Sequence, residues 1–190
     1  MTMSSDTLEG QLREMYGRAA YTHKTHEKMA DQSITKYRQI KTIEIALSAL
    51  ASSSFILAVF GDTHKATISG ALLSTVLLGF LLYFKEANLG QQAQKHTVTA
   101  SKLWGVREWL LSVLVDLRRT GDGQAAAQQR DEINAELEAI YKAAPRTDSK
   151  AYTAAQEALK NQEELFFSDD ELDHLLPKEL RKAGTGARNP

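Results

Sequence analysis

Two histidines and a glutamate near the N-terminus are the clearest group of possible metal ligands in this sequence. His23, His26 and Glu27 form the pattern HxxHE. Spacings of three and four residues place side chains on one face of a helix, where two of them could hold a zinc ion. A third ligand is not evident in the sequence. Packing or a solvated helix face is therefore the favoured interpretation, and we predict no metal site.

An acidic run near the C-terminus raises the question of a calcium site. Asp169, Asp170, Glu171 and Asp173 supply carboxylates, but they lack the alternating ligand spacing and the glycine of an EF-hand loop. Ser168 followed three residues later by Glu171 instead has the pattern of a helix-capping box. Acidic residues in a first helical turn also complement the helix dipole. The run therefore predicts the start of a short helix.

Signatures of enzymatic chemistry are missing from the sequence. The chain has no cysteine, which excludes a disulfide framework, an iron–sulfur cluster and a cysteine-based zinc site. Neither GxxxxGK[ST] nor GxGxxG occurs, so no phosphate-binding glycine loop is predicted. The net charge is −1, without the basic stripe of a nucleic-acid-binding protein. We predict that the protein is not an enzyme, uses no cofactor and does not bind nucleic acid directly.

Small and hydroxyl side chains within two apolar segments, 43–60 and 66–84, form the most informative set. Together with a glutamate at the edge of the first segment, the set comprises Glu44, Ser48, Ser52, Gly70, Ser74, Thr75 and Gly79. Several members are four residues apart and so share a helix face, which permits close packing of helices. The same face could line a water-filled lumen. Such a channel would require several subunits, because the two helices of one subunit cannot enclose it. The spacing favours helix packing. One face could also pack against another helix at rest and line a pore after a rearrangement.

The two apolar segments have the composition of membrane-spanning helices. Residues 66–84 contain no charge and no proline. At about 1.5 Å per helical residue they span roughly 28 Å, close to the thickness of a bilayer's hydrocarbon core. Residues 43–60 are less apolar, with Glu44 and several serines, and need a partner helix. A soluble bundle gives no reason for two helices without a polar face.

Basic residues flank this hairpin at its two outer ends. The flanking residues are Lys24, Lys28, Lys36, Arg38 and Lys41 before it, and Lys85, Lys95 and Lys102 after it. The polar turn, 61–65, contains only Lys65. Cytoplasmic loops carry the excess of lysine and arginine, so we expect both termini in the cytoplasm and the turn outside.

The sequence predicts an all-α fold in which long helices extend from a two-transmembrane hairpin into a cytoplasmic helical bundle. Leu8, Leu12 and Met15 begin a stripe at alternating spacings of four and three residues, the pattern of a helix-packing seam. Trp104 and Trp109 are expected in the core of the cytoplasmic body. The predicted parts are an N-terminal cytoplasmic helix (6–42), the transmembrane hairpin (43–84), a long return helix (85–119), short C-terminal cytoplasmic helices (128–177) and a disordered tail (183–190).

This order of elements resembles the SLATT families, two-transmembrane effector domains associated with bacterial nucleotide-signalling and sensor modules. The resemblance covers about residues 10–181 and is most specific where AAPRTDSKAYTAAQEAL runs into ELFFSDDELDHLLP. It implies an effector of a bacterial anti-phage conflict system, located in the inner (plasma) membrane. Such effectors oligomerise and permeabilise or depolarise the membrane when triggered. The implied partners are membrane lipid, further copies of the chain, and a separately encoded nucleotide-synthesising enzyme or reverse transcriptase.

Two other functions are compatible with the same residues. The chain could be a constitutive membrane scaffold or small channel with no role in defence. It could also be a soluble helical-bundle adaptor in which 43–84 forms the central core. The resemblance carries over no catalytic residues, so an enzyme is the least favoured interpretation.

Overall fold

The computed structural model describes residues 2–60, 64–162, 164–165, 167–177 and 180–181. Within these residues the chain forms helices and no strand, which confirms the all-α prediction. The helices are α1 (Thr2–Phe60), α2 (His64–Ala87), α3 (Leu89–Thr120), α4 (Gly123–Ala143), α5 (Ser149–Lys160) and α6 (Asp169–Leu175). The predicted tail and the first three residues of the predicted turn lie outside the described residues, while His64 and Lys65 already belong to α2.

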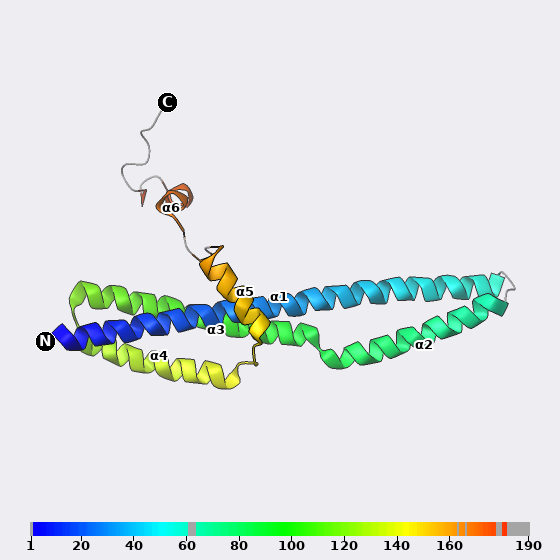
Figure 1. The fold of residues 1–190 in the computed structure, drawn as a ribbon, viewed down its shortest axis with the longest axis horizontal. Helices are drawn as coiled ribbons and strands as arrows, with labels where there is room; N and C mark the ends of the chain where they lie inside the picture. Colours follow the sequence, from blue (N-terminus) through cyan, green and yellow to red (C-terminus); the bar gives the residue numbers. More distant parts are fainter. Residues whose placement is uncertain (1, 61–63, 163, 166, 178–179, 182–190) are drawn as a thin grey trace, which may run out of the picture.

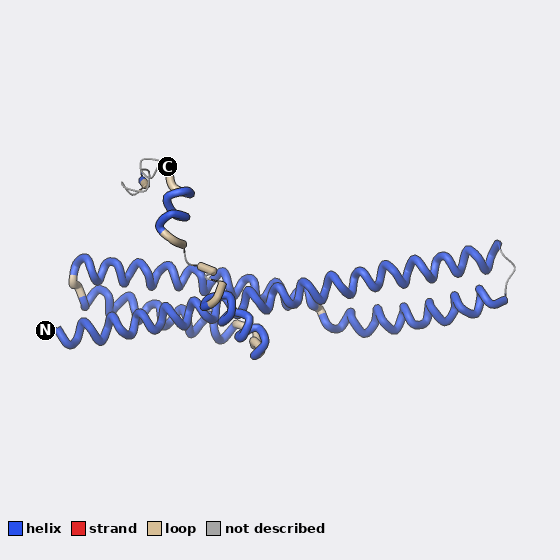
Figure 2. Tube along the Cα trace, turned by 45° about the horizontal axis from the view of Figure 1, so that its top comes forward, coloured by secondary structure: helices blue, strands red, loops and turns tan. Residues whose placement is uncertain are grey.

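Helix α1 runs the full length of the molecule, and the other helices are arranged along it (Figure 1). α2 returns beside the C-terminal half of α1, and α3 continues beside its N-terminal half. α4 packs against α3, and α5 crosses α1 at a steep angle near the middle of the molecule (Figures 1 and 2). The chain therefore has a slender two-helix arm at one end and a thicker helical body at the other.

The hydrophobic core lies in the body, between α1, α3 and α4. Leu12 and Met15 of α1 are fully buried, as are Leu103 and Leu110 of α3 and Ile133 of α4, and all belong to one cluster. The α1 members follow the packing seam seen in the sequence, so the apolar end of that seam is what binds α3. Burying each of these side chains contributes about 1.5–3 kcal/mol to the free energy of folding.

The prediction that both tryptophans lie in the core is wrong for Trp104. Its side chain is 50% exposed, whereas Trp109 packs against the core and its indole N–H donates a hydrogen bond to Gln129 Oε1 at 3.1 Å. The reason is helical geometry. Leu103 occupies the buried face of α3, and the next residue is rotated by about 100° to the edge of that face.

The junction between α2 and α3 differs from the predicted boundary at residue 85. α2 continues to Ala87, and Asn88 then adopts a left-handed conformation with φ of 40° and ψ of 42°. Asparagine is among the few residues that adopt this conformation readily, so a single residue ends one helix and starts the next. The chain changes direction there, between α2 and α3 (Figure 1).

Helices α3 and α4 are separated by a short connection that local residues stabilise. Gly121, with φ of 70°, caps α3 and donates its N–H to the Leu117 carbonyl oxygen at 2.9 Å. Asp122 caps α4, which therefore begins at Gly123 rather than at residue 128 as predicted. At the C-terminal end, the predicted capping box of Ser168 and Glu171 is confirmed.

Replacing Asp122 with alanine should lower the free energy of unfolding by about 1 kcal/mol. The Asp122 carboxylate accepts hydrogen bonds from the backbone N–H groups of Gln124 (3.1 Å) and Ala125 (3.0 Å), and alanine leaves both donors without this partner. Denaturant unfolding followed by tryptophan fluorescence measures the change. Asp116→Ala is the matched control, because Asp116 is an exposed residue in an ion pair with Arg119. Equal losses in the two variants would contradict the capping role.

Candidate functional site

The arm formed by α1 and α2 packs most closely through small side chains. A Cβ atom added to Gly70 would lie 3.3 Å from the Ser54 Cβ, tighter than most real contacts of this kind. Along α2, the residues half-buried against α1 recur at alternating spacings of three and four: Gly70, Leu73, Leu77, Phe80 and Phe84. The arm therefore uses a small residue at its point of closest approach, as helix pairs in membranes commonly do.

The structure divides the small and hydroxyl residues selected from the sequence into two groups. Glu44, Ser48 and Gly70 are half-buried where α1 and α2 run together. The second group, whose side chains are exposed, comprises Ser52, Ser74, Thr75 and Gly79. An added Cβ at Gly79 meets no atom within 4 Å. The exposed group is thus available to lipid, to water or to another copy of the chain.

Several hydroxyl groups of the arm donate hydrogen bonds within their own helices. Ser48 donates to the Glu44 carbonyl oxygen at 2.8 Å, Ser52 to the Ser48 carbonyl at 2.9 Å, and Thr75 to the Ala71 carbonyl at 2.9 Å. This bond to the preceding turn is common for serine and threonine in helices. Because the donors are already paired, these side chains tolerate an apolar environment and still present an oxygen to water.

The apolar surface of the arm is uncovered. Two helices, within Thr7–Leu57 and Thr67–Thr120, are long and apolar enough to cross a membrane, with mean hydropathies of 1.5 and 1.9 in their most apolar windows. No residue of either window is buried in the chain. Large side chains such as Phe55, Leu72 and Leu82 are all exposed. A contiguous apolar surface of this kind marks contact with a membrane or with another protein.

A group of buried polar side chains lies where α1, α3 and α5 meet; we call His23, Lys24, His26 and His96 the polar layer. His26 and His96 are only 2% and 3% exposed, and their Nδ1 atoms are 2.8 Å apart. The Nδ1 atom of His23 lies 2.9 Å from the Ala100 carbonyl oxygen. That oxygen can only accept, so the His23 Nδ1 carries the hydrogen.

The two facing imidazoles, His26 and His96, are held in their neutral forms. Burial lowers the pKa of His26 to about 4, and the nearby His96 and His23 rings add to the effect. Burial also lowers the pKa of His96, against the opposing influence of Asp148. One hydrogen fits between the two Nδ1 atoms, so one ring donates and the other accepts. Protonating both rings would place two donors and two positive charges in contact.

The sequence analysis identified His23 and His26 but missed His96, which is 70 residues from its partner His26. A signal was present in the spacing. Ala93, His96, Ala100 and Leu103 recur at three and four residues, and all are buried. A histidine at such a position on an apolar face indicates a buried polar partner on the facing helix.

Ion pairs connect the polar layer to the segment that follows α5. Lys24 pairs with Glu27 at 2.7 Å and also with Glu164, while Lys28 pairs with Glu164 at 3.1 Å. Burial lowers the pKa of Lys24, but the hydrogen bonds to Glu164 and Glu27 and the negative charges of the same two residues together outweigh burial, so the net shift of the pKa is upward. The hydrogen bond from Lys24 is the main reason that the pKa of Glu164 is lowered.

Helix α5 itself packs on α1 through small residues. Ala151 and Ala155 are completely buried, and the Tyr152 ring lies 6.3 Å from the Tyr21 ring of α1. An alanine face gives close but shallow contact, with little apolar area per residue. Helix α5 is therefore held against α1 by shallow alanine contacts and, through the segment that follows it, by the ion pairs of Glu164.

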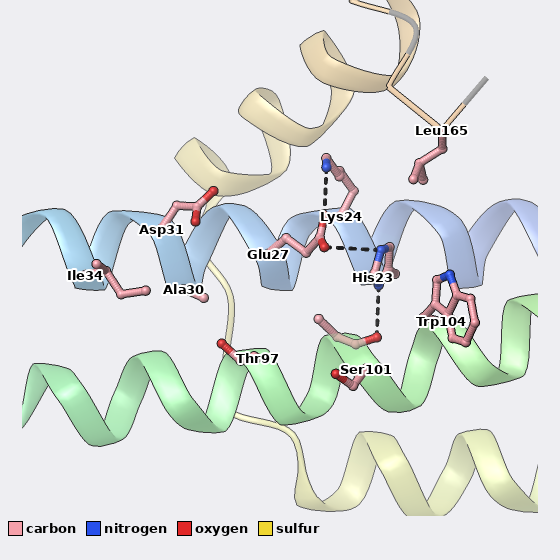
Figure 3. A pocket seen from close by; sticks show the side chains of 11 residues that line it. His23, Lys24, Glu27, Ala30, Asp31, Ile34, Thr97, Ser101, Trp104 and Leu165 are labelled. Atoms are coloured by element: carbon pink, nitrogen blue, oxygen red, sulfur yellow. Dashed lines mark hydrogen bonds and ion pairs between the residues drawn. The ribbon is translucent and has the colours of Figure 1, made fainter. Parts of the chain in front are cut away.

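A groove beside the polar layer has a volume of about 650 Å³ and lies between α1 and α3. Figure 3 shows His23, Lys24, Glu27 and Trp104 around it, with Glu27 linked to both Lys24 and His23. Its charges are mixed. Among the described residues no group of three or more His, Cys, Asp or Glu side chains could hold a metal ion. The arrangement supplies polar contacts between helices rather than a convergent set of reactive groups.

Comparison with known proteins adds one finding. The family model described as "SMODS and SLOG-associating 2TM effector domain family 4" matches residues 8–171. The match includes the arm, the polar layer and the start of α6. No curated protein and no solved structure matches the chain.

Proposed function

Because this chain belongs to the SMODS and SLOG-associating 2TM effector domain family 4, we propose that it is a membrane effector of a bacterial anti-phage system. In this proposal the chain assembles into an oligomer in the inner membrane, with both termini in the cytoplasm. When triggered, the oligomer permeabilises or depolarises the membrane. The chain carries out no catalysis of its own.

The observation that carries this proposal is the uncovered apolar surface of the arm. Neither apolar window is buried by the rest of the chain, although a soluble helical bundle would place such helices in its core. The basic flanks favour one orientation. Lys41 and Lys85 lie at the base of the arm, beside the body, and the positive-inside rule assigns that side to the cytoplasm.

An oligomer follows from the size of the arm, because two helices cannot enclose a water-filled path. Ser52, Ser74, Thr75 and Gly79 are exposed in the single chain. In the assembly these residues pack against neighbouring copies at rest and face the lumen after activation. The leucine-rich remainder of α2 faces lipid.

Gating is assigned to the cytoplasmic body, residues 6–42, 85–119 and 128–177. Beyond the apolar core, the polar layer joins α1 to α3 through hydrogen bonds, and its Lys24 joins α1 to the segment after α5 through an ion pair. Polar contacts can be exchanged for others of similar energy, which suits an element with two stable arrangements. A separately encoded nucleotide-synthesising enzyme or reverse transcriptase supplies the trigger in this scheme.

The location and topology can be tested with an epitope tag inserted at Asp62, between α1 and α2. We expect the protein in the membrane fraction and the tag accessible from the periplasm in cells whose inner membrane is intact. A tag at the N-terminus is the matched control and should be accessible only after lysis. Recovery in the cytosol without detergent would instead support the soluble adaptor.

Membrane insertion alone does not distinguish an effector from a constitutive scaffold or channel. Inducible expression, with growth and membrane potential as readouts, separates them. An effector should arrest growth and collapse the potential when expressed or triggered. Normal growth and potential at equal protein level would leave the scaffold as the better description.

A further inference from the structure

A cavity lies at the base of the arm, where α1, α2 and α3 meet. It has a volume of about 530 Å³, within the range of about 300–1,000 Å³ that is common for small-molecule sites. α1 contributes Tyr37, Ile40, Lys41 and Glu44, and the opposite wall contains Phe80, Leu81, Phe84, Lys85, Asn88, Leu89 and Gly90. We call it the junction cavity.

The cavity is a consequence of the backbone at both ends of α2. Near the tip, the contact between Gly70 and Ser54 brings the two helices close together. At the base, the left-handed conformation of Asn88 redirects the chain between α2 and α3 (Figure 1). The junction cavity lies beside this change of direction.

The lining has two chemically distinct parts. The part nearer the tip of the arm is aromatic and aliphatic, with Phe80 and Phe84 in contact at a ring separation of 4.6 Å. The part nearer the body has polar and cationic groups from Lys41, Lys85 and Asn88 beside apolar or aromatic side chains, and the Glu44 carboxylate of α1 lies toward the tip and pairs with Lys41. This order matches a phospholipid, whose acyl chains lie toward the membrane centre and whose phosphate lies at the interface.

The charges of the cavity favour an anionic ligand. Lys41 pairs with Glu44 at 2.8 Å and lies 6.0 Å from the centre of the Tyr37 ring. Lys85 is exposed and forms no ion pair with any residue whose side chain is described. Two lysines against one glutamate leave the lining with one net positive charge. Basic pockets between membrane helices on the cytoplasmic side are recognised sites for anionic headgroups.

We propose that the junction cavity binds an anionic glycerophospholipid of the cytoplasmic leaflet. The headgroup phosphate interacts with Lys85 and Lys41, and an acyl chain lies along Phe80, Leu81 and Phe84. The inference rests on the proposed insertion of the arm into the membrane. A lipid in this position contacts α1, α2 and the start of α3 together, so the local lipid composition affects how these helices pack at the base of the arm.

The test uses the full chain in vesicles containing equal amounts of phosphatidylglycerol and phosphatidylcholine. After gentle extraction into detergent, mass spectrometry measures the two lipids retained by the protein. We expect phosphatidylglycerol to be enriched, and Lys85→Gln and Lys41→Gln each to reduce the enrichment about fivefold. Lys65→Gln, at the opposite end of the arm, is the matched control and should leave it unchanged.

A second pair of variants tests the shape of the cavity without changing charge. A Cβ at Gly90 meets no atom within 4 Å, and Gly90 lines the cavity, so Gly90→Phe should fold and reduce retention of both lipids. Gly105→Phe is the control, because Gly105 also has open space but lies on α3 outside the cavity. Circular dichroism checks that both variants remain helical.

The outcomes separate this inference from the proposed function. Equal retention of the two lipids by the unaltered chain would overturn the inference, as would enrichment that survives both lysine changes and Gly90→Phe. Loss of the bound lipid on adding inorganic phosphate alone would overturn it in favour of a free-anion site. If the tag at Asp62 is accessible from the periplasm of intact cells but the protein shows no lipid preference in vesicles, only the inference is defeated. An inaccessible tag defeats the proposed function and the lipid site together.

Discussion

Cells that express a Thr75→Leu variant should keep their membrane potential under conditions in which the unaltered chain collapses it. Thr75 is exposed on α2, and its hydroxyl donates a hydrogen bond to the Ala71 carbonyl oxygen. The same Oγ1 atom can still accept a hydrogen bond from water in a lumen. Leucine removes that oxygen and adds apolar bulk. Apolar constrictions close a narrow pore by expelling water from it. We therefore expect near-complete loss of depolarisation, measured with a potential-sensitive dye.

The neighbouring residue provides the control for this variant. Val76 is exposed on an adjacent face of α2, and Val76→Leu also enlarges an apolar side chain. Leucine at a lipid-facing position favours insertion, so this variant should depolarise cells as the unaltered chain does. Both variants must be present in the membrane at equal level. If Thr75→Leu depolarises cells normally at that level, Thr75 does not line a lumen.

Acidification should destabilise the helical body by about 3 kcal/mol between pH 7 and pH 4 through the His26–His96 pair. The pKa of His26 in the folded chain is lowered to about 4, from an ordinary value of 6.5. Between these values the unfolded chain binds a proton that the folded chain excludes. The stabilisation is therefore fully present above pH 6.5 and is lost as the pH falls toward 4.

Denaturant unfolding in detergent at several pH values measures this loss, since both tryptophans lie on α3 in the body. The double variant His26→Leu, His96→Leu replaces the polar pair with an apolar pair and should flatten the dependence over this range. His174→Gln is the control, because His174 is exposed on α6, and the dependence should persist in that variant. An equally steep loss in the double variant would assign the effect to another group, such as Glu164, whose pKa is lowered in the folded chain.

The helical content and the core of the body could be predicted from the sequence because they depend on local spacing. Leu12 and Met15 lie on a regular stripe, and so do Leu103 and Leu110, and a buried face is the physical meaning of such a stripe. The capping box at Ser168 was equally predictable, since all of its atoms come from within four residues.

What the sequence did not predict depends on contacts between distant residues or on a single backbone angle. His96 becomes informative only when α3 lies against α1 and meets His26. The exposure of Trp104 follows from the exact rotation of α3, which a repeat of three and four residues leaves uncertain by about one position. The change of direction at Asn88 requires one left-handed residue, and an asparagine in a helical stretch is compatible with either conformation.

The outgoing and returning paths of the chain along the molecule differ in helix continuity. α1 is one unbroken helix of 59 residues, about 88 Å long, from the far end of the body to the tip of the arm. α2 and α3 return along α1 as two helices separated at Asn88, whose backbone is left-handed. We therefore expect a rotation of α1 near Lys24 also to rotate Ser52, which lies on the same helix. Because α5 contacts α1 and Glu164 pairs with Lys24, we expect a displacement of α5 to alter the α1 side of the arm.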